Sequence, residues 1–217
     1  LSQSGTPLVI HSGHGPAPGR FTGPSGMEAL LGKRPRGRRC ETRRVHETDE
    51  EIADLQRLLD ASIGRASGHL TGIVNDEQRL NARQLVTELT GMKVLVLATV
   101  TARGEPRTSC VDGHFVHGRW LFGTSPTAIK AKHMLARPAV SATHVDGERI
   151  GVFTHGTAHV VSEGPEFDEH NAYFTEFYGS DPQTWEGPGV IYATIEPSWM
   201  VAYAAEPAAF PEQTKTD

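Results

Sequence analysis

The chain has 217 residues, 37% of them hydrophobic, and a formal net charge of −5, which suits one globular domain and argues against a chain built wholly to bind nucleic acid. No apolar run approaches the ~20 residues of a membrane span, and no basic segment followed by an apolar export signal is visible. The two cysteines, Cys40 and Cys110, are too few for a disulfide framework, so we expect a soluble protein of the reducing cytoplasm with no membrane partner.

The first 45 residues differ in composition from the rest of the chain. They are rich in Gly, Ser and Pro and show no apolar period, so they cannot bury enough surface to offset the entropy of ordering. Seven basic side chains are concentrated between Lys33 and Arg44. We predict a disordered basic extension over 1–45, with an arm that binds nucleic acid as the alternative.

Two helices are predicted before the first strand. Thr48 stands three residues before Glu51, which is the spacing of a capping box. Apolar residues then recur at helical spacing, at Ile52, Leu55, Leu59 and Ile63. A second helix is expected over 80–89, where three leucines lie near one face, and Gly91 would end it.

The rest of the chain predicts short strands with helices inserted between them. Strands are expected at 92–101, 107–116, 119–125, 139–145 and 149–162, with two closing strands at 189–197 and 198–204. Helices are expected at 125–136 and 165–178. This order favours a mainly β antiparallel barrel with flanking helices over a doubly wound parallel sheet. We divide the chain into a helical segment at 46–78, a barrel domain at 79–205 and a flexible tail at 206–217.

The segment GTSPTAIKAKHML, residues 123–135, has features of an anion site. Ser125 is predicted to cap the helix, and Pro126 suits its first position. Free amides at the positive end of the helix dipole would then attract an anion, with Lys130 in reach and Lys132 as a second cation. The two lysines leave the helix in different directions, so an ordinary exposed helix is an equal alternative on spacing alone.

The surroundings of this helix carry a longer pattern over residues 94–145. A strand ending in LATV leads to a Gly-Pro turn, a second strand that begins with a basic residue and a third strand that ends in TS. The lysine-bearing helix and RPAVS follow. This ordered set resembles the core of the pyridoxamine 5′-phosphate oxidase-like family of flavin-binding split barrels and their deazaflavin-using relatives, and the resemblance extends from about 80 to 204. It implies a split β-barrel of antiparallel Greek-key type, and a homodimer with the cofactor between its subunits.

The resemblance also implies cofactor-binding residues. Ring-facing positions would be Arg107, Thr108, Ser109, Cys110, Val111 and Asp112, and the end of the third strand would contribute Gly123, Thr124 and Ser125. Lys130 falls where the family has a phosphate-binding lysine. Ile129 replaces the arginine that precedes this lysine in the named oxidase, and Lys132 would supply the second charge, as in deazaflavin-using relatives. No catalytic residue is assigned, because a flavin or deazaflavin itself carries the hydride.

By this resemblance the chain is an oxidoreductase that uses FMN, or alternatively coenzyme F-420, on a small organic substrate. The end of the chain has neither the arginine nor the histidine with which the named oxidase holds pyridoxal phosphate, so vitamin B6 phosphates are not the expected substrate. The alternatives are a haem or cofactor carrier without turnover and a nucleic-acid-associated protein. Four histidines favour the carrier: His114, His117, His155 and His159. His155 and His159 would lie ~13 Å apart on a strand, so no metal site is predicted.

Overall fold

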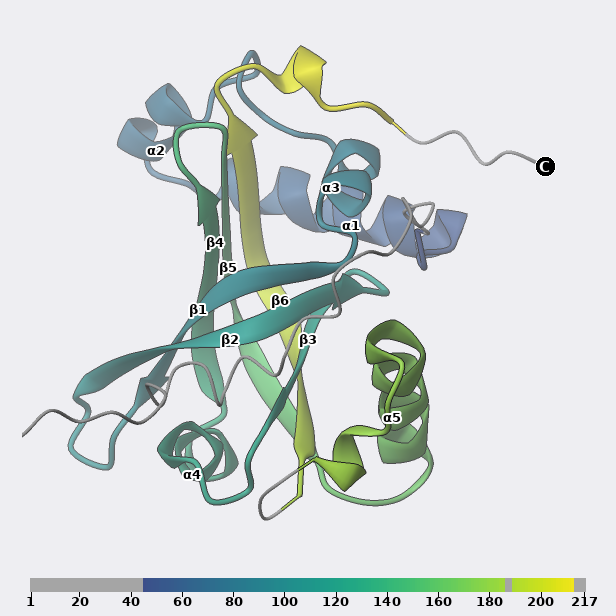
Figure 1. Ribbon diagram of the computed structural model, residues 1–217. Helices are drawn as coiled ribbons and strands as arrows, with labels where there is room; N and C mark the ends of the chain where they lie inside the picture. The colour runs from purple at the N-terminus through teal and green to yellow at the C-terminus, as the bar shows by residue number, and fades with distance from the viewer. Residues whose placement is uncertain (1–44, 186–188, 213–217) are drawn as a thin grey trace, which may run out of the picture. The chain divides into compact units, whose positions relative to one another are not determined.

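The computed structural model describes residues 45–185 and 189–212. Residues 1–44 and 213–217, which include nearly all of the predicted extension and the end of the predicted tail, lie outside this description. The helices and strands, shown in Figure 1, are α1 (Asp49–Gly64), α2 (Gly68–Ile73), α3 (Ala82–Glu88), β1 (Met92–Val100), β2 (Pro106–Val116), β3 (Arg119–Thr124), α4 (Ile129–Ala136), β4 (Ala139–Asp146), β5 (Ile150–Val161), α5 (Pro165–Tyr178), the 3-10 helix η1 (Pro182–Thr184), β6 (Ile191–Ala204) and the 3-10 helix η2 (Pro207–Ala209). Within the described ranges, no helix is both long enough and apolar enough to span a membrane.

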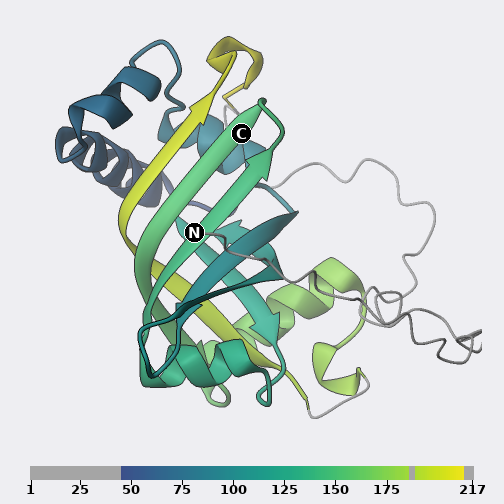
Figure 2. The same ribbon diagram turned by 90° about the vertical axis from the view of Figure 1, so that its left-hand side faces the viewer.

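Six antiparallel strands close into a barrel in the order β1-β2-β3-β6-β5-β4, and Figure 2 shows the strands from the side. Inward-facing residues such as Leu95, Leu97 and Phe122 are fully buried and form the core. Trp120 fills the centre of the core, and its indole Nε1–H donates a hydrogen bond to the Thr154 hydroxyl over 3.1 Å. This architecture confirms the predicted antiparallel barrel with flanking helices.

The two closing strands predicted at 189–197 and 198–204 are wrong, because they form the single strand β6. Gly156 of β5 pairs with Pro197 and His155 pairs with Trp199, so Ser198 is an extra residue and the register shifts there. The β-bulge at Ser198 accommodates a proline that cannot donate to the ladder, which is why the sequence predicts a break.

The N-terminal helices form largely as expected. The predicted capping box is present in α1, where the Thr48 amide donates to the Glu51 carboxylate over 2.7 Å and the Glu51 amide donates to the Thr48 hydroxyl over 3.2 Å. Ser62 ties α1 to β6, because its carbonyl accepts the Trp199 indole N–H and its hydroxyl accepts the Met200 amide. The six-residue helix α2 was not predicted, since it is too short to show an apolar period.

The described part of the predicted tail carries structure. Residues 207–209 form η2, and Phe210 is buried in the main core with 5% of its surface exposed. The domain boundaries at 45, 78 and 205 stay predictions.

Helix α5 packs on the barrel through a second aromatic cluster centred on His114 of β2. The two ring nitrogens of His114 lie 2.9 Å from the Tyr173 hydroxyl and 3.1 Å from the Tyr178 hydroxyl. The ring is fully buried and makes edge contacts with Phe174 and Phe177. Burial lowers the pKa of His114 to about 4, so the ring is neutral, and one nitrogen donates while the other accepts.

The bulge predicts a strict requirement for glycine at position 156. A Cβ at this position would collide with the Glu196 carbonyl oxygen. We expect Gly156→Ala to lower the free energy of unfolding by about 3 kcal/mol, measured by urea denaturation. The control is Gly72→Ala, because a Cβ on this α2 residue meets no atom within 4 Å. Equal stability of the two variants would contradict the bulge.

The buried His114 predicts a pH dependence of stability. Its folded pKa lies at about 4, below the ordinary value of 6.5, so the unfolded chain binds a proton that the folded chain does not. The contribution of the neutral His114 to the free energy of unfolding is therefore fully present above pH 6.5. It is lost as the pH falls towards 4, and the total loss is about 3 kcal/mol. We expect the stability of the His114→Gln variant to fall less over this range. Parallel stability curves for the two proteins would show that His114 is not the titrating group.

Candidate cofactor-binding site

The helix predicted to have Ser125 as its N-cap begins three residues later than expected. Helix α4 begins at Ile129, and Ala128 is its N-cap. The Ser125 hydroxyl instead accepts the Thr127 amide over 3.2 Å, and the Ser125 carbonyl accepts the Ala128 amide over 3.0 Å. Ser125 therefore closes a turn after β3 and does not cap the helix, so the prediction of Ser125 as N-cap and Pro126 as first helical residue is wrong.

Helix α4 is fixed to the end of β1. Its His133 ring lies 2.9 Å from the hydroxyl of Thr99, and the Arg137 guanidinium that follows the helix donates to the Val100 carbonyl over 2.8 Å. Ala131 and Met134 are buried beneath the helix. These contacts hold α4 at the end of the barrel where β1 turns into β2, below the strands in Figure 1.

The start of α4 has the donors that an anion requires. Its N-cap residue, Ala128, makes no side-chain hydrogen bond, so no side chain of the described residues caps the first amides of the helix. Lys130 is half-buried in the first turn, and Lys132 is exposed on another side of the helix. Thr124 and Ser125, at the end of β3, are half-buried next to this turn in the chain. Amides, hydroxyls and ammonium groups are the donors that bind phosphate, so these residues fit the phosphate of a nucleotide cofactor.

The six positions predicted on β2 do not share one face. Thr108, Cys110 and Asp112 are exposed on the outer face of the barrel, whereas Val111 is buried and pairs with Leu95 of the core. Ser109 is half-buried on the inner face, opposite Leu97. Only the outer three can offer their side chains to a ligand on the barrel surface, because successive side chains of a strand point to opposite faces.

Arg107 is held by its own turn. Its guanidinium donates to the Glu105 carboxylate over 2.7 Å and to the Pro106 carbonyl over 3.1 Å, and its side chain is about half exposed. Its backbone nevertheless meets α4 indirectly, because the Thr99 hydroxyl that contacts His133 also donates to the Arg107 carbonyl over 3.5 Å.

An apolar patch adjoins the outer residues of β2. Val94 and Val96 of β1 are 55% and 41% exposed, and they pair with Asp112 and Cys110 across the ladder. Val145 of β4 is 54% exposed on the same face. We call Val94, Val96 and Val145 the valine patch. Because Cys110, Asp112 and the valine patch are exposed, this face of the barrel is open to solvent on a single chain.

The four histidines considered as ligands are not grouped. His114 is held by two tyrosines, His117 lies 3.0 Å from a Glu51 carboxylate oxygen, and His159 lies 3.0 Å from Glu166. His155 contacts Ser141 and stacks on Trp199 with 4.7 Å between the ring centres. In the described residues, no three His, Cys, Asp or Glu side chains are placed to hold a metal ion.

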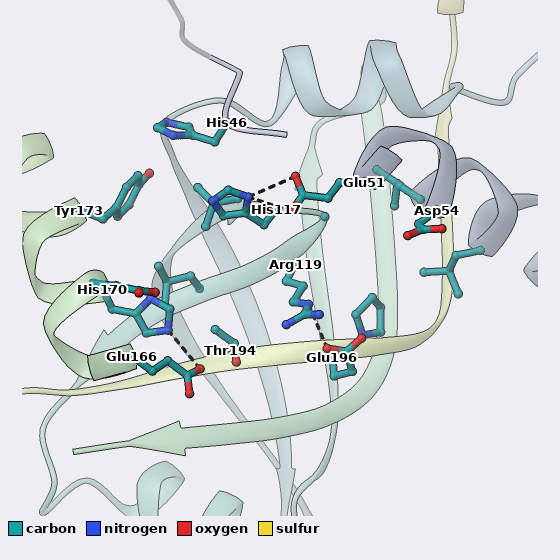
Figure 3. Close-up of a pocket in the computed structure, with 17 residues that line it drawn as sticks. His46, Glu51, Asp54, His117, Arg119, Glu166, His170, Tyr173, Thr194 and Glu196 are labelled. Carbon is teal, nitrogen blue, oxygen red and sulfur yellow. Dashed lines mark hydrogen bonds and ion pairs between the residues drawn. The ribbon is translucent and has the colours of Figure 1, made fainter. Parts of the chain in front are cut away.

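A separate cavity of about 720 Å³ opens between α1, the β2–β3 turn, α5 and β6, and Figure 3 shows the side chains around it. Five carboxylates and three histidines are among its lining residues, and no motif of the sequence predicted the cavity. One signal was present: Glu166, Glu169, His170 and Tyr173 follow helical spacing and place a polar stripe on one face of α5.

The barrel is similar to several solved structures at low sequence identity. One is General Stress Protein 26 from Bacillus anthracis, at 14% identity and a TM-score of 0.45, covering 55% of this chain and 91% of that one. A pyridoxamine 5′-phosphate oxidase-related, FMN-binding protein from Nostoc punctiforme matches at 17% identity and a TM-score of 0.42, covering 51% and 73%. HutZ, the haem storage protein from Vibrio cholerae, matches at 20% identity and a TM-score of 0.44, covering 51% and 86%. At TM-scores below 0.5, these similarities carry no functional argument.

Sequence comparison with protein families is more informative. No curated protein matches the chain. The model of the pyridoxamine 5′-phosphate oxidase family, however, matches residues 82–196, from α3 into β6 and over more than half of the 217 residues. The matched region includes α4, the outer face of β2 and the end of β3. The chain therefore belongs to the pyridoxamine 5′-phosphate oxidase family.

Proposed function

We propose that this protein is a cytoplasmic oxidoreductase that binds FMN at α4 and the outer face of β2, and that it acts on a small organic substrate as a homodimer. Coenzyme F-420 is the alternative cofactor. One observation carries the proposal. The start of α4 has no side-chain cap and bears Lys130, and hydrogen bonds hold this helix at the β1–β2 end of the barrel. Membership of the family supports the same placement.

Each group has a distinct role in this proposal. The first amides of α4 and the Lys130 ammonium bind the phosphate, with Lys132 as a second cation. Thr108, Cys110 and Asp112 lie beside the ring on the outer face of β2. The bound flavin supplies hydride transfer, and the protein contributes orientation and exclusion of water. Arg107 is not needed for the phosphate, because its guanidinium is engaged by Glu105.

A second copy of the chain is the proposed cover of the open site. The valine patch is exposed, and two of its residues pair across the ladder with the proposed ring contacts: Val94 with Asp112 and Val96 with Cys110. Exposed apolar side chains of this kind gain free energy when a partner removes them from water. A twofold pairing through this patch would place the ring between the two subunits and exclude water from it.

The phosphate role of Lys130 predicts a specific loss of affinity. We expect Lys130→Ala to raise the Kd for FMN about tenfold or more, because it removes a charge-assisted hydrogen bond to the phosphate. Lys132→Ala is expected to have a smaller effect, since this side chain is exposed. The measurement is the change in flavin fluorescence when apo-protein is titrated with FMN, repeated with F-420.

Two controls accompany this titration. Lys130→Arg keeps the charge and should retain most of the affinity, and Arg57→Ala removes an exposed charge on α1 without effect. If neither lysine substitution changes the affinity for either cofactor, the site assignment is wrong. An absorbance spectrum of haem in the purified protein, with no flavin or deazaflavin binding, would favour the carrier alternative.

The valine patch predicts a dimer that one substitution breaks. We expect Val96→Lys to convert the dimer into a folded monomer, because the symmetric interface would bury two lysines, and to raise the Kd for FMN in parallel. Light scattering coupled to gel filtration measures the mass. Ile73→Lys on α2 is the matched control, since Ile73 is 45% exposed but lies away from the patch. A wild-type monomer that binds FMN tightly would refute the shared site.

A further inference from the structure

The cavity whose lining side chains are drawn in Figure 3 has the size of a small-molecule site. Its volume of about 720 Å³ lies within the usual range for such sites. Its apolar lining comes from Leu55 and Leu58 of α1, from Val116 and Leu121 of the barrel, and from Pro197. Leu55 and Leu121 are almost fully buried, so their side chains are fixed.

The polar lining of the cavity carries more negative than positive charge. Five carboxylates line it: Glu51, Asp54, Glu166, Glu169 and Glu196. Among the described residues, two of them have permanent cations as partners, since Glu196 binds Arg119 and Asp54 binds Arg57. Glu51 and Glu166 contact imidazoles, at His117 and at His159. Glu169 forms no salt bridge within the described part of the chain.

The wall formed by α5 also contains a buried atom without a hydrogen-bond partner. This atom is Nε2 of His170, which is buried and has no hydrogen-bond partner among the described residues. The nearest carboxylate oxygen, from Glu166, lies 3.6 Å away and beyond hydrogen-bond distance. Figure 3 shows His170 and Glu166 together on the α5 side of the cavity. A buried polar atom of this kind is normally satisfied by a ligand or by water.

The cavity lining selects between classes of ligand. Anions are disfavoured, because five carboxylates line the cavity and Arg119 is the single lysine or arginine in its described lining. A bare metal ion is disfavoured too, since no group of three ligating side chains is placed to hold one in the described residues. An ammonium group on an apolar body matches both the carboxylates and the apolar lining.

We propose that this cavity is a second ligand site, separate from the cofactor site, and that it binds an organic ammonium compound. The ammonium group lies against Glu166, Glu169 and His170 of α5. The apolar body of the compound packs on the leucines and on the ring of Tyr173. Tyr173 keeps its hydroxyl proton, since burial raises its pKa and its hydroxyl bonds to His114.

The test compares three probes that share a phenyl body and differ in charge. Phenethylamine, 2-phenylethanol and 3-phenylpropanoate are titrated into the full chain at pH 7.5 and followed by calorimetry. We expect saturable binding of phenethylamine, binding of the alcohol that is about tenfold weaker, and no binding of the carboxylate. Equal affinity for the amine and the alcohol would overturn the proposal, as would the absence of saturable binding of the amine.

Charge-matched variants locate the site. We expect Glu169→Gln to weaken phenethylamine binding about fivefold, and the double variant Glu166→Gln/Glu169→Gln to weaken it further. The control is Glu163→Gln, which removes an exposed carboxylate next to α5 that does not line the cavity. Both Glu163 and Glu169 are exposed, so folding should be unaffected, and thermal melting checks this. Equal losses from Glu163→Gln and Glu169→Gln, or no loss from either, would overturn the assignment. FMN affinity should be unchanged in all of these variants, so this test is independent of the cofactor site.

Discussion

The proposed cofactor site depends on one buried hydroxyl, that of Thr99. It contacts His133 of α4 on one side and the carbonyl of Arg107 in β2 on the other. Only 2% of the residue is exposed, so both contacts are shielded from water. The β1–β2 hairpin and α4, whose His133 lies 34 residues after Thr99 in the sequence, thereby meet at one end of the barrel. Without this connection, α4 would be held by its buried apolar residues and by the Arg137 hydrogen bond to β1.

Much of this fold could be predicted because its signals are local. The capping box of Thr48 and Glu51 involves four consecutive residues, and the His117-Gly118 turn requires only two residues with positive φ. Where prediction failed, a longer-range partner decided the outcome. Ser125 resembles a cap, but its hydroxyl is used by Thr127 in a turn. Pro197 resembles a strand end, but Gly156 of another strand leaves room for a bulge.

The candidate sites differ in the same way. The proposed cofactor residues lie along one stretch of chain that the family model matches, so the sequence could propose them, although only the structure separates the outer and inner positions of β2. The acidic cavity combines α1, the β2–β3 turn, α5 and β6, which lie up to 150 residues apart in the sequence. Apart from the polar stripe of α5, no local pattern points to such a cavity. The two proposed sites also have opposite electrostatic character, with lysines and helix amides at one and carboxylates at the other, so we expect them to bind different ligands.

The barrel closes unevenly, and this has a consequence for how the protein associates. β2 pairs with β1 along residues 106–114 but with β3 only at His114, Phe115 and Val116. β1 likewise pairs with β4 only at Val96, Leu97 and Ala98. Within the described sheet, residues 106–113 of β2 therefore have a ladder partner on the β1 side alone, next to the exposed side chains of Cys110 and Asp112. A ligand or partner on this face can reach main-chain donors and acceptors as well as side chains.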